Sequence, residues 1–79
     1  MKNKITEILG WYGVVAIIAA YIMVTFSFIK PTDLWYLILN GTGAMGIVAD
    51  ALDDKNYQPM VLNIIWAIIA GIAIIRLFV

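Results

Sequence analysis

The stretch LGWYGVVAIIAAYIMVTFSFI, residues 9–29, decides the fold class of this chain. It contains no charged side chain, and a bilayer core about 30 Å thick needs about 20 mainly apolar residues in a helix. The apolar part of a secretory signal is shorter, at about 7–15 residues. We therefore interpret residues 9–29 as a retained membrane-spanning helix.

The sequence after this stretch repeats the pattern twice. Residues 30–33 (KPTD) interrupt the first run, because proline removes a backbone donor and disfavours helix at the residue before it. Residues 53–58 (DDKNYQ) form a second polar turn, after an apolar run over 34–52, and Pro59 suits the first turn of a third helix over 59–78. The sequence thus predicts an all-α membrane protein, a single domain over 1–79, with three transmembrane helices in an up-down-up bundle that oligomerises.

Composition excludes most other classes of protein. The chain is 65% hydrophobic, with five basic and five acidic residues and neither Cys nor His. A soluble chain of 79 residues could not bury so much apolar surface. The missing residue types argue against an enzyme, a metal site or a cofactor, and the balanced charge argues against a nucleic-acid partner.

Each predicted helix has a face of small residues. Small side chains four positions apart let two membrane helices approach closely, as in Thr42-x-x-x-Gly46 and Ala67-x-x-x-Gly71. We expect helix packing at Gly13, Gly43, Gly46, Ala67 and Gly71. The large apolar side chains on the remaining faces are then expected to meet lipid.

Five polar or aromatic side chains within the apolar runs are candidates to line a ligand site or pore. They are Asn40, Asp50, Asn63, Trp66 and Tyr21. A carboxylate inside a membrane is costly and is a functional hypothesis by default. The structural alternative is that Asp50 reaches the interface or accepts a hydrogen bond from Asn63, and that Trp66 fills the bundle. Trp11 and other aromatic residues near the ends of the runs are interpreted as interfacial anchors.

Several motifs carry a resemblance to known proteins. They are Ile8-Leu9-Gly10-Trp11-Tyr12-Gly13 with Ala20-Tyr21, then Leu39-Asn40-x-x-Gly43-Ala44, then Tyr57-Gln58-Pro59-x-Val61-Leu62-Asn63-x-x-Trp66-x-x-Ile69-Ala70. Together they resemble a family of small, three-span, permease-like bacterial inner-membrane proteins of unknown function. The resemblance implies a multi-pass protein of the bacterial inner membrane. More distantly, the third run resembles the SemiSWEET half-transporters, which implies that Asn63 and Trp66 line a sugar path between two subunits.

Two functions follow from these observations. Three helices are too few to enclose a polar path, so we expect a homo-oligomer, with a dimer favoured, that acts as a half-transporter or channel for a small solute. The alternative is a non-transporting assembly or accessory subunit of a larger membrane complex, in which the small-residue faces dock on a partner. The oligomeric state in detergent distinguishes the two, since a discrete dimer favours the half-transporter.

Overall fold

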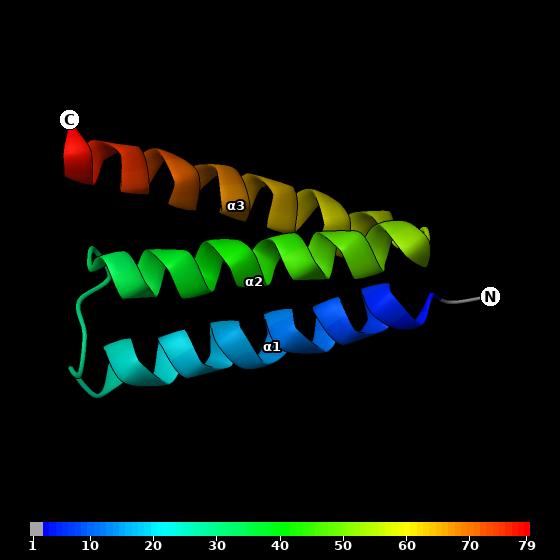
Figure 1. Cartoon of the computed structure of the whole chain (residues 1–79), viewed down its shortest axis with the longest axis horizontal. Coiled ribbons are helices and arrows are strands. Elements are labelled where there is room, and N and C mark those ends of the chain that lie inside the picture. The colour runs from blue at the N-terminus through cyan, green and yellow to red at the C-terminus, as the bar shows by residue number, and fades with distance from the viewer. Residues whose placement is uncertain (1–2) are drawn as a thin grey trace.

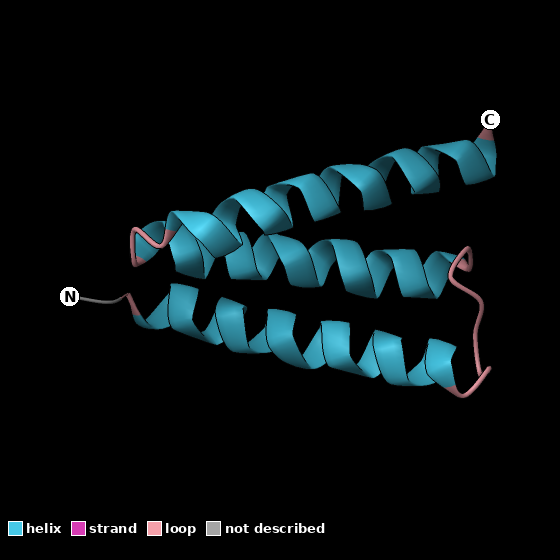
Figure 2. Cartoon of the chain, turned by 180° about the vertical axis from the view of Figure 1, so that it is seen from behind, coloured by secondary structure: helices cyan, strands magenta, loops and turns pink. Residues whose placement is uncertain are grey.

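The computed structural model describes residues 3–79, which form three helices joined by two short connections (Figure 1). The helices are α1 (Lys4–Thr25), α2 (Leu34–Asp53) and α3 (Tyr57–Phe78). Successive helices run in opposite directions, and Figure 2 shows only helix and loop over the described residues. The N-terminal end of α1 therefore lies at the same end of the molecule as the α2–α3 turn.

The helices form an open row, which corrects the predicted bundle. α2 lies in the middle and packs against both neighbours, whereas α1 and α3 make no contact with each other across the described residues (Figures 1 and 2). The physical reason is that α2 offers small residues on two sides. Gly43 and Gly46 face α1, and Gly41 faces Ala70 of α3, so each neighbour occupies a different side of α2.

Only two of the helices are long and apolar enough to cross a membrane. These are α1 and α3, of 22 residues each, whereas α2 is less clearly apolar. The prediction of three membrane-spanning helices is therefore wrong. α2 is less apolar because it contains Asn40, Asp50 and three glycines. The length of the run over residues 34–52 is therefore a poor measure of how apolar α2 is.

The fold buries small side chains and exposes large ones. The buried apolar residues are Ala16, Ala20, Leu37, Ala44, Ala51 and Ala70, and no large side chain among the described residues is fully buried. In the most apolar 18-residue segment of each helix, only 22% of α1 and 11% of α3 is buried. A core helix of a soluble protein is mostly buried. Apolar surface of this extent marks contact with lipid or with other proteins.

Local hydrogen bonds set where the helices begin and end. Asn3 caps α1, since its side-chain oxygen accepts a hydrogen bond from the Ile5 N–H at 2.8 Å. α1 ends in a Schellman motif, in which the Phe28 N–H donates to the Met23 carbonyl at 2.8 Å and Ser27 has a φ of 64°. α2 ends in the same way, with Lys55 at a φ of 56°. Both connections therefore start with a tight, hydrogen-bonded reversal.

Candidate functional site

Glycine residues build the contact between α1 and α2. A Cβ on Gly13 would collide with the carbonyl oxygen of Gly43, and a Cβ on Gly46 would collide with that of Leu9. The two helix backbones are therefore in direct contact, which only glycine permits at these positions. We call these residues, Gly13, Gly43 and Gly46, the glycine seam.

One polar pair crosses the same interface. The Tyr12 hydroxyl lies 2.7 Å from Thr42 Oγ1, which in turn donates to the Ile38 carbonyl at 2.6 Å. A threonine hydroxyl has a single proton to donate, so the Tyr12 hydroxyl donates to Thr42. The pair fixes the register of α1 against α2.

The carboxyl group of Asp50 lies in a pocket between α1 and α2. The pocket has a volume of about 220 Å³ and is lined by Gly10, Trp11, Val14, Ile47 and Asp50. Asp50 Oδ1 is shielded from solvent. A Cβ on Gly10 would lie only 2.5 Å from Asp50 Oδ2, so the missing side chain of Gly10 makes room for the carboxyl group. We call this cavity the Asp50 pocket.

A second carboxylate, that of Asp53, connects α1 with α2 at the end of the molecule that contains the Asp50 pocket. Asp53 Oδ2 accepts a hydrogen bond from the Asn3 N–H at 2.6 Å and one from Thr6 Oγ1 at 2.9 Å. A negative charge at a helix N-terminus is favourable, because the unpaired N–H groups there carry partial positive charge. Asp53 thus ties the start of α1 to the end of α2. Residues 3–79 contain no group of His, Cys, Asp and Glu that could hold a metal ion.

The contact between α2 and α3 is less close. A Cβ on Gly41 would lie 3.2 Å from the Cβ of Ala70, which is tight but not a backbone collision. Asn63 is buried and its amide donates to the Pro59 carbonyl, within the same helix, at 2.8 Å. Asn40 is also buried. Both side chains therefore lie inside the protein.

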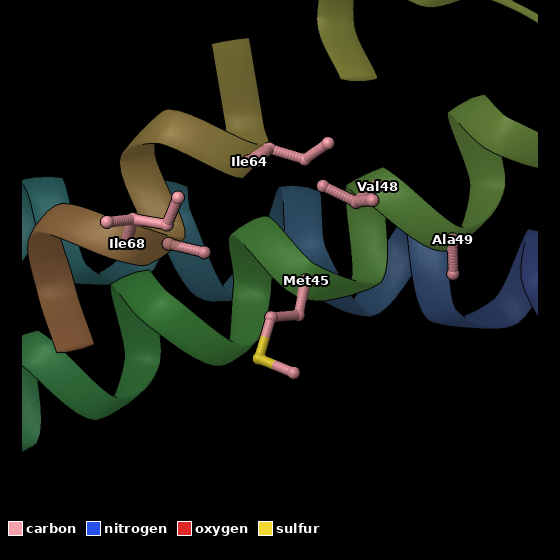
Figure 3. A pocket seen from close by; sticks show the side chains of 6 residues that line it. Met45, Val48, Ala49, Ile64 and Ile68 are labelled. Atoms are coloured by element: carbon pink, nitrogen blue, oxygen red, sulfur yellow. The ribbon is translucent and has the colours of Figure 1, made fainter. Parts of the chain in front are cut away.

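An apolar groove of about 410 Å³ runs between α2 and α3 (Figure 3). It is lined by Met45, Val48, Ala49, Ile64, Ala67 and Ile68. Figure 3 shows Met45 and Val48 projecting from α2, and Ile64 and Ile68 from α3, with no polar side chain among the sticks. A smaller hollow that shares Met45 and Ala67 adds Gly41 and Gly71 to the lining.

The structure distributes the predicted site residues over several places. Asp50 lines the pocket with Trp11 and Gly10, whereas Asn40 and Asn63 are buried. Trp66 and Tyr21 are 43% and 68% exposed, so they lie on the outer surface of this single chain.

The predicted packing residues also differ from one another. Gly13, Gly43 and Gly46 form the seam, Ala67 lines the groove, and a Cβ on Gly71 would meet nothing within 4 Å.

Sequence reasoning missed two members of the pocket. The position of Trp11 near the end of an apolar run indicates only an interfacial anchor, and the sequence pattern assigns no role to Gly10. The available signal was the adjacency of Gly10 and Trp11 on a helix that must lie beside the polar end of α2. Nothing in the helical spacing of one segment shows which residue of a neighbour it meets.

Comparison with known proteins places the chain in a family but not in a functional class. The chain belongs to an uncharacterised protein family, whose model matches residues 6–79. No curated protein and no solved structure matches the chain. The resemblance to SemiSWEETs therefore gains no support from these comparisons.

Proposed function

We propose that the chain is one subunit of a membrane-embedded homo-oligomer, a dimer in its simplest form, that acts as a half-transporter or channel for a small solute. One observation carries this proposal. The carboxyl group of Asp50 lies in a pocket at the surface of a single open row of helices. A polar site in this position needs a further subunit to enclose a path.

The distribution of apolar surface supports the membrane location. α1 and α3 expose large side chains such as Ile18, Ile69 and Ile72, all more than half exposed. In the proposed arrangement these helices meet lipid, and α2 is covered by protein on two sides. The bacterial inner membrane is inferred only from the resemblance to small permease-like proteins.

A two-fold arrangement would give the remaining predicted residues a role. Trp66 and Tyr21 are exposed in one chain, and contact with a second copy would bring them into the interior. The suggested role of Asn63 and Trp66 in lining a solute path stays a prediction.

Flux measurements on purified protein in liposomes test the proposal. The wild-type protein is expected to transport at least one solute of a broad panel faster than empty vesicles do. Asp50→Asn and Asn63→Ala should reduce that flux, whereas Asp54→Asn, which changes an acid outside the pocket, should not. Equal flux in all preparations and in empty vesicles, over the whole panel, would contradict the proposal.

A second candidate function is an accessory subunit of a larger membrane complex. The observation that favours it is the groove of Figure 3, which is wide, apolar and lined partly by small residues. A helix of a larger protein could pack there as small-residue faces do elsewhere. Affinity capture in mild detergent tests this candidate: a stoichiometric larger partner supports it, and recovery of self-dimers alone counts against it.

A further inference from the structure

We propose that the Asp50 pocket binds an alkylammonium cation. This inference deepens the proposed function, because it names the chemical class of the solute, and it rests on that function for any role in transport. The binding itself is a property of the pocket and can be measured without flux.

The carboxylate supplies the charge complement. Asp50 is the only acidic residue that lines the pocket, and the other lining residues carry no charge. Electrostatic attraction is stronger in such surroundings than in water, because the local dielectric constant is lower. A bound ammonium group next to Asp50 would therefore be held more firmly than at an exposed aspartate.

The other walls of the pocket favour an organic cation over a metal ion. Hard metal cations take six or more oxygen ligands, and the lining provides oxygen from one side-chain carboxyl group. Val14 and Ile47 present aliphatic surface, which suits the carbon substituents of an amine. Trp11 adds an indole ring, the best aromatic partner for a cation.

The surrounding charges exclude an anionic ligand. At this end of the molecule α1 carries Lys4 and Glu7, α2 ends at Asp53, and the turn carries Asp54 and Lys55. With Asp50 there are four acids against two lysines among the described residues. A neutral sugar fits no better, because Asp50 and the Trp11 N–H are the only polar side-chain groups in the lining.

Titration with a matched pair of compounds tests this inference. The probe is benzyltrimethylammonium, and its uncharged analogue neopentylbenzene has the same shape with carbon in place of nitrogen. Calorimetry on the full chain in uncharged maltoside micelles measures the Kd, and the indole N–H signal of Trp11 in a ¹⁵N NMR spectrum locates the site. Trp11→Phe assigns that signal. We expect saturable binding and a shift of the Trp11 signal with the cation only.

Three variants connect the binding to the pocket. Asp50→Asn keeps the shape of the side chain and should weaken binding roughly tenfold to a hundredfold. Asp54→Asn removes an acid that does not line the pocket and should leave the Kd within about twofold. If Asp50→Asn alters the whole spectrum, the variant Trp11→Leu is used in its place. This variant is expected to weaken binding of the cation by about fivefold.

Two sources of an ammonium group are distinguished by adding lipids. Short-chain phosphatidylethanolamine that shifts the Trp11 signal in an Asp50-dependent manner identifies a lipid headgroup as a ligand, whereas phosphatidylglycerol should have no effect. Equal binding of the neutral analogue, equal Kd in the pocket variants, or no saturable binding of any ammonium compound would overturn the inference. Cation binding without flux would refute the proposed transport alone, and flux of another solute without cation binding would refute this inference alone.

Discussion

Gly13 and Gly71 differ in the atoms that surround them. Gly13 and Gly71 both belong to small-residue faces, yet Gly13 touches the backbone of α2 and Gly71 borders open space. Sequence periodicity identifies a small-residue face but not its partner, because the partner depends on how the helices are arranged in space.

A pair of alanine substitutions tests this difference. Gly13→Ala should destabilise the protein by about 1–3 kcal/mol, since its Cβ must displace the Gly43 carbonyl. Gly71→Ala should be neutral or stabilise by up to about 1 kcal/mol, because alanine is the better helix former and its Cβ meets no atom. Unfolding in mixed micelles, followed by circular dichroism, measures both. Equal stability of the two variants would contradict the direct backbone contact.

Ser27 provides a second residue-scale prediction. Its φ of 64° lies in the left-handed region, which glycine adopts without a steric penalty. Ser27→Gly should therefore stabilise the protein by about 1 kcal/mol, whereas Ser27→Ala, which keeps the Cβ, should not. The same unfolding measurement applies, and a destabilised glycine variant would refute the role assigned to the Schellman motif.

At the scale of the elements, α3 and α2 were predicted more closely than α1. Residues 34–52 and 59–78 nearly match Leu34–Asp53 and Tyr57–Phe78. The first run, 9–29, is displaced because α1 starts at Lys4 and ends at Thr25. At its start, α1 is extended by the Asn3 cap, which a hydropathy pattern does not detect. At its end, Phe26, Phe28 and Ile29 are apolar but lie after the helix.

The hydrogen bonds of Asp53 predict how the start of α1 behaves. Asp53→Ala removes the acceptor for Asn3 and Thr6, so the first turn of α1 should fray and the protein should lose about 1 kcal/mol of stability. Hydrogen exchange is the measurement: amides in the first turn of α1 should exchange faster, while amides near Ala20 keep their rates. Asp54→Ala is the control, and equal exchange in both variants would contradict the capping role.

At the scale of the whole molecule, the open row explains why the sequence led to the wrong number of membrane-spanning helices. A helix that lies between two others has less exposed surface, so it can carry Asn40, Asp50 and several glycines in place of large apolar residues. These polar and small residues also lower the mean hydropathy of α2. The sequence identifies the polar residues of α2 as candidates. It does not identify the residues that they contact, because these depend on how the three helices are arranged.

The proposed membrane-embedded arrangement predicts what surrounds the exposed apolar side chains of α1 and α3. The chain has no native cysteine, so single-cysteine variants carry one spin label each. Labels at Ile18 of α1 and Ile72 of α3 should be accessible to oxygen, which dissolves in lipid, and protected from a water-soluble nickel complex. A label at Asn56, in the exposed turn, should show the reverse. Strong accessibility of Ile18 or Ile72 to the nickel complex would exclude the membrane-embedded arrangement.

In the proposed arrangement a single chain does not enclose a solute path, and function arises between copies. The most direct measurement is flux in liposomes as a function of the number of chains per vesicle, counted by stepwise photobleaching of a single label. We expect no flux above background in vesicles with one chain, and Asp50-dependent flux in vesicles with two or more. Flux through vesicles that contain one chain would contradict the proposed arrangement.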